Sequence, residues 1–303
     1  MAGLEAVRSS RRSLRPPLPV EERAELAAEQ NRRETRVTLF LAAAFLLYCP
    51  LTLALDTTTS GSQQVLLGLT TWAFLVVALR LCPAEQRIQV ISMVIVATGF
   101  ECLGSLVLRA YTYRLDNLPL YVPPGHGLFF LVAVRLAVLP WVERRARLVV
   151  VAVFAGSILL LARGLLQPTP DLFGFGSWLV LVPFLFCSRF GFLYAISFGL
   201  TMALEYYGTT LGNWAWAPES PILGLPTGNP PAAIGVGYCI MDSLARAFAP
   251  RVQVLRVRLT EHKLRASGTS ERGPTWPIGP TLRPFERYWT VIVPRMLGWM
   301  RHM

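Results

Sequence analysis

The sequence predicts an all-α, multi-pass membrane protein of about eight transmembrane helices in two tandem four-helix repeats of the same orientation. Hydrophobic residues make up 53% of its 303 residues and charged residues only 16%, whereas soluble domains carry about a quarter charged residues. The apolar residues gather in runs long enough to cross about 30 Å of hydrocarbon. Two segments also repeat the same residue types in the same order. These observations argue against a soluble domain, a disordered chain and a nucleic-acid-binding protein.

Eight apolar runs have the length and composition of membrane spans. The fourth and the sixth are short, and we expect them to be extended or tilted. The runs are Val37–Leu55, Val65–Cys82, Ile88–Ala110, Gly127–Trp141, Leu148–Leu166, Leu172–Cys187, Phe190–Tyr206 and Pro231–Phe248.

The distribution of arginine predicts the orientation of these spans. With a cytoplasmic N-terminus, the arginines around 142–147 lie in an inner loop, while the outer loops 56–64 and 207–230 contain none. Positive residues favour the cytoplasmic side, so we expect both termini to be cytoplasmic in a bacterial-type inner membrane. The net charge of +11 is concentrated at the chain ends, where it faces anionic headgroups. We expect no nucleic-acid partner.

The chain divides into four regions by composition. Residues 1–36 form a polar cytoplasmic segment without the short apolar run of a signal peptide, so we expect the first span to anchor the chain. The first four-helix repeat covers 37–142 and the second covers 143–248. Residues 249–303 form a basic cytoplasmic tail, and 287–303 suits a helix lying among the headgroups.

The repeated segments are 101–124 and 205–231. Each begins with E-x-x-G and a small hydroxyl residue, continues with aromatic-x-aromatic, and ends in L-P-x-x-x-P-P. Three shared elements in one order are hard to obtain by chance. The corresponding residues are Glu101 and Glu205, Gly104 and Gly208, Ser105 and Thr209, Tyr111 and Trp214, Tyr113 and Trp216, Leu118 and Leu225, Pro119 and Pro226, Pro123 and Pro230, and Pro124 and Pro231.

Each repeated segment contains the outer end of one span, an outer loop and the start of the next span. This arrangement predicts a two-fold axis roughly along the membrane normal, with a functional site between the halves. Because proline ends helices and restricts the preceding residue, we expect both loops to be ordered re-entrant caps.

Glu101 and Glu205 are the candidate catalytic residues. A charge in hydrocarbon costs at least about 2.5–3.5 kcal/mol and therefore points to function. Burial favours the neutral carboxyl group, which can donate a proton. The alternative is that each glutamate fixes the packing of a neighbouring helix.

The alignment also pairs Arg135 with Asp242, each eleven residues after the second proline of its P-P pair. Both are expected near mid-membrane, where an ion pair between the halves would satisfy both charges. We expect this pair to be structural, because removing one partner leaves an uncompensated charge at a cost of about 3–5 kcal/mol.

The outer loops supply candidate substrate-binding residues. Their aromatic pairs form either an ordinary interfacial belt or a lipid pocket that stabilises a developing cation. His126 is either a hydrogen-bonded cap or part of the site. The chain has three His and five isolated Cys, so we expect no metal site and no cofactor. The candidates are Tyr111, Tyr113, Asn117, His126, Asn213, Trp214, Trp216 and Asn229.

The pattern E-x-x-G, then Y-x-Y, then a proline-rich segment resembles the membrane-bound carotenoid biosynthesis proteins, notably the carotenoid hydratase type. The resemblance covers 101–126 and, more loosely, 205–231, while 107–109 replace the family's glycine-rich Phe-Gly segment. It implies modification of an isoprenoid or another long apolar lipid within the bilayer. Hydration of an isoprenoid requires a neutral acid and a positioned water, and Glu101 and Glu205 would divide these roles.

Two other functions compete with a hydratase (a lyase). Lipid-linked glycosyl transfer, or another outer-leaflet lipid reaction, would use Asp56, although no second acidic residue is expected beside it. A non-enzymatic lipid-binding, transport or scaffold protein would use the repeated loops as a cleft. Replacing either repeated glutamate by Gln should inactivate an enzyme without unfolding it and leave a scaffold unaffected. A transporter should instead depend on Arg135 and Asp242.

Overall fold

The computed structural model describes residues 19–248. Of these residues, 19–40 belong to one compact unit and 41–248 to another, and the side-chain contacts considered below all lie in the second unit. The expected basic tail 249–303 and its interfacial helix fall outside the described residues.

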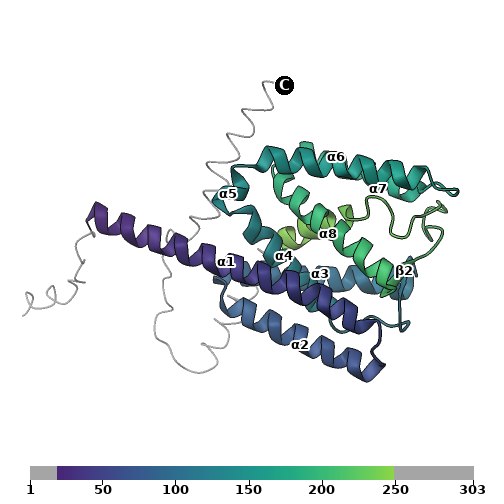
Figure 1. The fold of residues 1–303 in the computed structure, drawn as a ribbon, viewed down its shortest axis with the longest axis horizontal. Helices are drawn as coiled ribbons and strands as arrows, with labels where there is room; N and C mark the ends of the chain where they lie inside the picture. The colour runs from purple at the N-terminus through teal and green to yellow at the C-terminus, as the bar shows by residue number, and fades with distance from the viewer. Residues whose placement is uncertain (1–18, 249–303) are drawn as a thin grey trace, which may run out of the picture. The chain divides into compact units, whose positions relative to one another are not determined.

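The described chain is helical for most of its length, with a short strand in each half. The elements are α1 (Val20–Asp56), α2 (Gly61–Arg80), α3 (Ala84–Glu101), the π-helix η1 (Cys102–Val107), β1 (Tyr111–Tyr113), α4 (Val122–Ala137), α5 (Pro140–Glu143), α6 (Ala146–Leu165), α7 (Leu172–Phe186), α8 (Gly191–Leu211) and β2 (Trp214–Trp216), followed by a helical stretch over 236–248 (Figure 1).

A helix lies at each of the eight apolar runs. Within residues 19–248, four helical segments are long and apolar enough to cross a membrane, by length and composition: Ala24–Asp56, Gly61–Arg80, Ala84–Val107 and Ala146–Leu165. Shorter apolar helices cover Val122–Ala137 and Leu172–Phe186.

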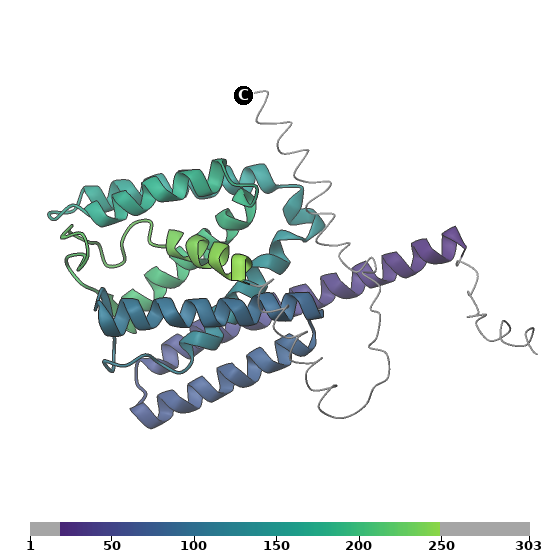
Figure 2. The same cartoon turned by 180° about the vertical axis from the view of Figure 1, so that it is seen from behind.

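Helix α4 packs against α2, α3 and α8 and is largely buried (Figures 1 and 2). It begins with Pro123 and Pro124 in its first turn, where a missing N–H costs nothing and the fixed φ suits a helix. In the other half, α6, α7 and α8 pack against one another, around a core that includes Leu181, Phe198 and Cys239.

The two halves are joined by an antiparallel pair of short strands. Strand β1 pairs with β2 so that Tyr111 lies opposite Trp216 and Tyr113 opposite Trp214. The expectation of an all-helical chain needs this correction: the aromatic-x-aromatic segments are strands, because the two loops satisfy their backbone groups by pairing with each other.

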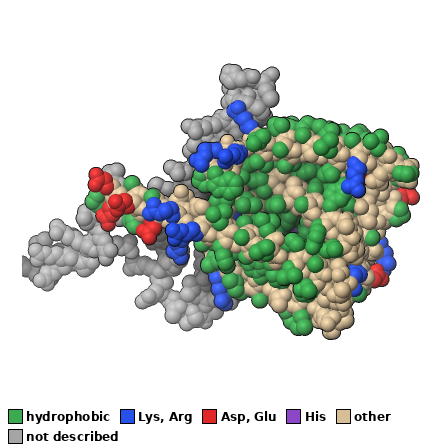
Figure 3. Space-filling model, viewed as in Figure 1, with side chains coloured by type: hydrophobic (Ala, Val, Ile, Leu, Met, Phe, Trp, Pro, Cys, Tyr) green, Lys and Arg blue, Asp and Glu red, His purple; other side chains and the backbone are tan. Residues whose placement is uncertain are grey.

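The outer surfaces of the helices are apolar. Leu47 and Leu159 are 75% and 71% exposed, and Figure 3 shows hydrophobic side chains covering much of one face of the molecule. Large exposed apolar areas are unfavourable in water, whereas hydrocarbon accommodates them. The apolar surface therefore agrees with the presence of helices that are long and apolar enough to cross a membrane.

Candidate functional site

The E-x-x-G motif of the first half positions Glu101 and makes room for the strand beside it. Glu101 is the last residue of α3, and the chain continues into η1. A Cβ on Gly104 would lie 2.9 Å from the Tyr111 ring, so only glycine fits without displacing that ring. The hydroxyl of Ser105 donates to the carbonyl of Glu101 at 2.7 Å.

The second half makes the corresponding contacts. Glu205 lies on α8, and a Cβ on Gly208 would lie 2.0 Å from the Trp214 ring. The hydroxyl of Thr209 donates to the carbonyl of Glu205 at 2.7 Å. The glycine and the hydroxyl residue of the E-x-x-G segment therefore make the same local contacts in both halves.

Glu101 accepts three hydrogen bonds. The phenol hydroxyls of Tyr111 and Tyr113 both donate to its Oε2, each at 2.8 Å. The Nε2 of His126 lies 2.9 Å from its Oε1. Glu101 is 8% exposed, so this buried carboxyl group is almost completely surrounded by donors.

Glu205 accepts two hydrogen bonds. The indole N–H groups of Trp214 and Trp216 both donate to its Oε2, each at 3.0 Å. In the described part of the chain no partner contacts its Oε1, and the residue is only half-buried. Within residues 19–248, the second carboxylate oxygen of Glu205 therefore lacks the protein donors that enclose Glu101.

The strand pairing brings the two glutamate centres together. Alternate residues of a strand share a face, so the four aromatic residues of β1 and β2 point to the same side. The rings of Tyr111 and Trp216 lie 4.7 Å apart between centroids, and those of Tyr113 and Trp214 6.0 Å. Glu205 lies within electrostatic range of Glu101.

The two tyrosines of β1 remain protonated. Burial, together with the nearby charge of Glu101, raises the pKa of Tyr111 and of Tyr113 above the usual range of a phenol. Both hydroxyls therefore keep their protons and act as hydrogen-bond donors to Glu101.

The expected ion pair between Arg135 and Asp242 is replaced by two local arrangements. Asp242 accepts from the Nε of Arg246 through both oxygens at 2.9 Å, one helical turn away, where opposite charges meet easily. The Nε of Arg135 donates to Gln86 at 3.1 Å, and its Nη2 donates to the carbonyl of Leu81 at 3.3 Å. The spacing of Asp242 and Arg246 was the signal that the sequence analysis missed.

The three candidate asparagines hold the loops in place. Asn117 donates to Gln64 at 2.8 Å, and Asn229 accepts from the backbone N–H of Trp216 at 3.0 Å. Asn213 donates to Asp56 at 3.1 Å and to the carbonyl of Leu53 at 2.9 Å. Their contacts indicate a supporting role around the glutamate centres.

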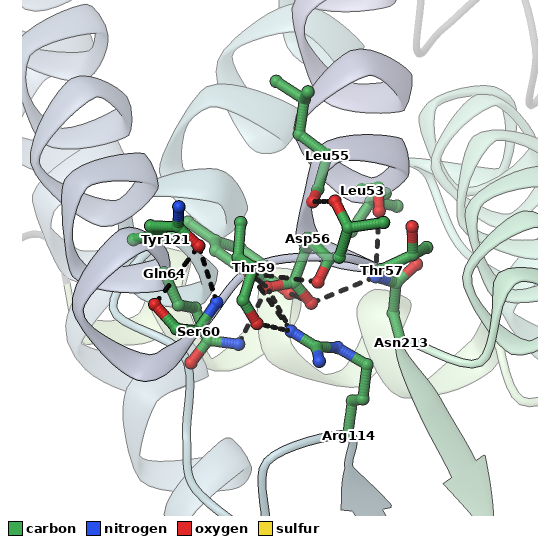
Figure 4. Close-up of polar contacts among 12 residues, drawn as sticks. Leu53, Leu55, Asp56, Thr57, Thr59, Ser60, Gln64, Arg114, Tyr121 and Asn213 are labelled. Atoms are coloured by element: carbon green, nitrogen blue, oxygen red, sulfur yellow. Dashed lines mark hydrogen bonds and ion pairs between the residues drawn. The ribbon is translucent and has the colours of Figure 1, made fainter.

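Asp56 is fully buried at the centre of a polar cluster that joins both halves (Figure 4). Its carboxylate oxygens face donors from the following turn, from α2, from the loops flanking β1 and from the residue before β2. The partners and distances are Thr59 at 3.1 Å, Gln64 at 2.8 Å, Arg114 at 3.7 Å, Tyr121 at 3.1 Å and Asn213 at 3.1 Å.

Asp171 is a second buried aspartate, in the loop between α6 and α7 of the second half. It follows α6 as Asp56 ends α1. Its carboxylate accepts the backbone N–H groups of Gly174 at 2.8 Å and Ala232 at 2.6 Å. Its position before the sixth span was the available signal, but it lies outside the repeated segments.

Around the two glutamates, two side chains of the kinds that bind metal ions contact each other, namely Glu101 and His126. Within residues 19–248, no group of three or more His, Cys, Asp or Glu side chains is arranged to hold a metal ion. The described site thus offers acid–base groups and aromatic faces.

Comparison with known proteins identifies no relative. No protein-family model, no curated protein and no solved structure matches the chain. The function is therefore inferred from the chemistry of the two glutamates and the side chains around them.

Proposed function

We propose that the protein is an eight-span inner-membrane enzyme that adds water across a double bond of a long apolar isoprenoid lipid. Its two four-helix repeats share one orientation, both termini are cytoplasmic, and the site opens between the halves near the outer side. The helices at all eight apolar runs and the arginine distribution support this layout. One observation carries the activity: both donors to Glu205 bind its Oε2, so that within the described residues its Oε1 accepts no hydrogen bond.

Glu205 is the proton donor in this mechanism. Indole N–H groups can only donate, and both occupy Oε2. A proton on Glu205 therefore resides on Oε1. When it passes to the alkene, the O–H bond breaks, a new C–H bond forms, and the neighbouring carbon becomes a tertiary cation.

The aromatic side chains of β1 and β2 stabilise this cation. The faces of aromatic rings attract positive charge, and the effect grows when water is excluded. Tyr111 and Trp216 are in ring contact and only partly buried. They can therefore present ring surface to a lipid while donating to the glutamates.

Water then completes the reaction on the Glu101 side. Its oxygen forms a bond to the cationic carbon, and one of its protons leaves to a base next to Glu101. Return of this proton to Glu205 restores the resting enzyme, so one water is consumed for each double bond. The cycle needs no oxidant or reductant.

The environment of Asp56 argues against lipid-linked glycosyl transfer. A catalytic carboxylate needs an oxygen accessible to substrate, whereas Asp56 is fully buried and both of its oxygens bind protein donors. Its contacts make it part of the scaffold.

Lipid analysis tests the proposal. Membranes from cells that lack the protein and from cells that overproduce it are extracted and compared by mass spectrometry. We expect an isoprenoid to gain the mass of one water with the wild type and with the exposed-loop control Glu219→Gln, and to remain unchanged with Glu205→Gln. Unchanged lipids with the overproduced wild type, or equal product from Glu205→Gln, would overturn it.

A further inference from the structure

His126 is the imidazole in direct contact with the Glu101 centre. It is the fifth residue of α4, its side chain is 17% exposed, and its Nε2 lies 2.9 Å from Glu101. Its partner Glu101 accepts from Tyr111, whose ring contacts that of Trp216, a donor to Glu205. The corresponding residue of the second half is Ala233, so this side chain distinguishes the Glu101 centre from the Glu205 centre.

Glu101 is poorly suited to accept the proton itself. Two phenol hydroxyls occupy Oε2 and the imidazole occupies Oε1. Hydrogen bonds to a carboxylate stabilise its charged form, and a carboxylate can only accept. The imidazole must then place its own proton on Nε2, which leaves the lone pair on Nδ1. In the described part of the chain Nδ1 has no hydrogen-bond partner.

Tyr238, from the helical stretch 236–248 of the second half, holds the imidazole in this orientation. Its ring stacks on that of His126, with centroids 5.7 Å apart and planes inclined by 21°. Its hydroxyl donates to the backbone carbonyl of His126 at 2.8 Å. It is 3% exposed and packs against Phe129. The second half therefore fixes a residue of the first.

We propose that His126 Nδ1 is the base that takes the proton of the attacking water, with Glu101 and Tyr238 as positioning residues. This inference rests on the proposed hydration. As the water oxygen bonds to the cation, one O–H bond breaks and its proton moves to Nδ1, forming an imidazolium beside the Glu101 carboxylate. The imidazolium then returns the proton to Glu205 through water. The arrangement follows the general logic of a carboxylate that orients an imidazole.

The tautomer of His126 tests the pair without a substrate. Protein labelled with ¹⁵N-histidine is measured by NMR at about pH 8, above the ordinary titration range of imidazole, and the signals are assigned by their loss in His126→Gln. We expect the proton on Nε2. In Glu101→Gln the amide oxygen should face the two phenols and its NH₂ group should face Nε2, which moves the imidazole proton to Nδ1. The control Glu205→Gln should leave the tautomer unchanged.

Activity separates this inference from the proposed hydration. With the purified protein and lycopene in phosphatidylcholine vesicles, we expect His126→Gln and Glu101→Gln to lower the rate of water addition by about 10³-fold or more, as a wrong tautomer does elsewhere. Tyr238→Phe, which keeps the stacked ring, should lower kcat with little change in KM.

A proton on Nδ1 in the wild type, or a His126→Gln rate within about tenfold of wild type, would overturn the role of His126 while leaving hydration intact. The expected tautomers without any hydration would contradict the proposed function and leave the Glu101–His126 pair established.

Discussion

The two glutamate centres are built alike but have different surroundings. Each glutamate accepts two bonds on one oxygen from an aromatic strand, and each is followed by a glycine that clears space for one of those rings. Glu101 receives phenols and an imidazole, whereas Glu205 receives indoles and keeps Oε1 without a described partner. A similar backbone frame therefore holds one carboxylate with donors on both oxygens and the other with donors on one oxygen.

The difference indicates how two similar sites can bind a carboxyl group in two ways. Changing the aromatic type and adding one histidine alters the hydrogen bonding of a carboxyl group, while the strand pairing keeps the two groups close. The buried aspartates behave similarly: Asp56 binds side chains from both halves, and Asp171 binds backbone N–H groups. The predictions below compare the halves directly.

The largest stability difference is expected between Asp56→Ala and Asp171→Ala. The first leaves Arg114 and several polar groups without their buried partner, which typically costs about 3–5 kcal/mol. The second loses two backbone hydrogen bonds, at about 1–3 kcal/mol. Thermal unfolding in detergent, with the exposed Asp116→Ala as control, measures both. Equal losses for the two aspartates would contradict the assignment of Asp56 as the link between halves.

The next largest difference in stability is expected between alanine substitutions of the two motif glycines, Gly208 and Gly104. In Gly208→Ala the new methyl group overlaps the Trp214 ring, and we expect a loss near the upper end of about 1–3 kcal/mol. Gly104→Ala, which meets the edge of Tyr111, should fall near the lower end. Gly156→Ala has open space around its Cβ and should be neutral or slightly stabilising. A Gly208→Ala protein as stable as wild type would refute the close packing of that ring.

Double-mutant cycles test which of the two glutamates is ionised, because they measure the coupling free energy between each glutamate and one of its donors. Hydrogen bonds to charged groups contribute about 1.5–3 kcal/mol and neutral ones about 0.5–1.5 kcal/mol. We therefore expect a larger coupling between Tyr113→Phe and Glu101→Gln than between Trp216→Phe and Glu205→Gln. The cycle removes most of the cavity effect of each single change. If the order is reversed, Glu205 is the ionised group and cannot be the resting proton donor.

The smallest effect concerns the residues that end the two helices. Gly212 has φ of 76° and Arg109 has φ of 51°, a region that costs non-glycine residues about 1–2 kcal/mol. Gly212→Ala should therefore destabilise by about 1 kcal/mol, while Arg109→Gly should stabilise slightly. Chemical denaturation of both variants measures the change in the free energy of unfolding and its sign. A stabilising Gly212→Ala would show that the two turns are not equivalent.

The helices were predictable because long apolar runs leave few alternatives, and Glu101 and Glu205 stood out as charges within them. The strands at Tyr111 and Trp214 were not, since three alternating residues are too few to distinguish a strand from a loop and each strand pairs with a partner in the other half. The same applies to His126 and Tyr238, which meet although 112 residues separate them. Asp242 and Arg246 are the opposite case, because their spacing of four already indicated a helical ion pair.

Oxygen-18 water provides the most direct test of the two-centre mechanism. Purified protein is reconstituted with lycopene in phosphatidylcholine vesicles, and the lipids are analysed by mass spectrometry after incubation in labelled water. The account predicts one labelled oxygen in the product with the wild type and with Glu219→Gln, and none with Glu205→Gln. Labelled product formed by Glu205→Gln at the wild-type rate, or no labelled product from the wild type, would contradict it.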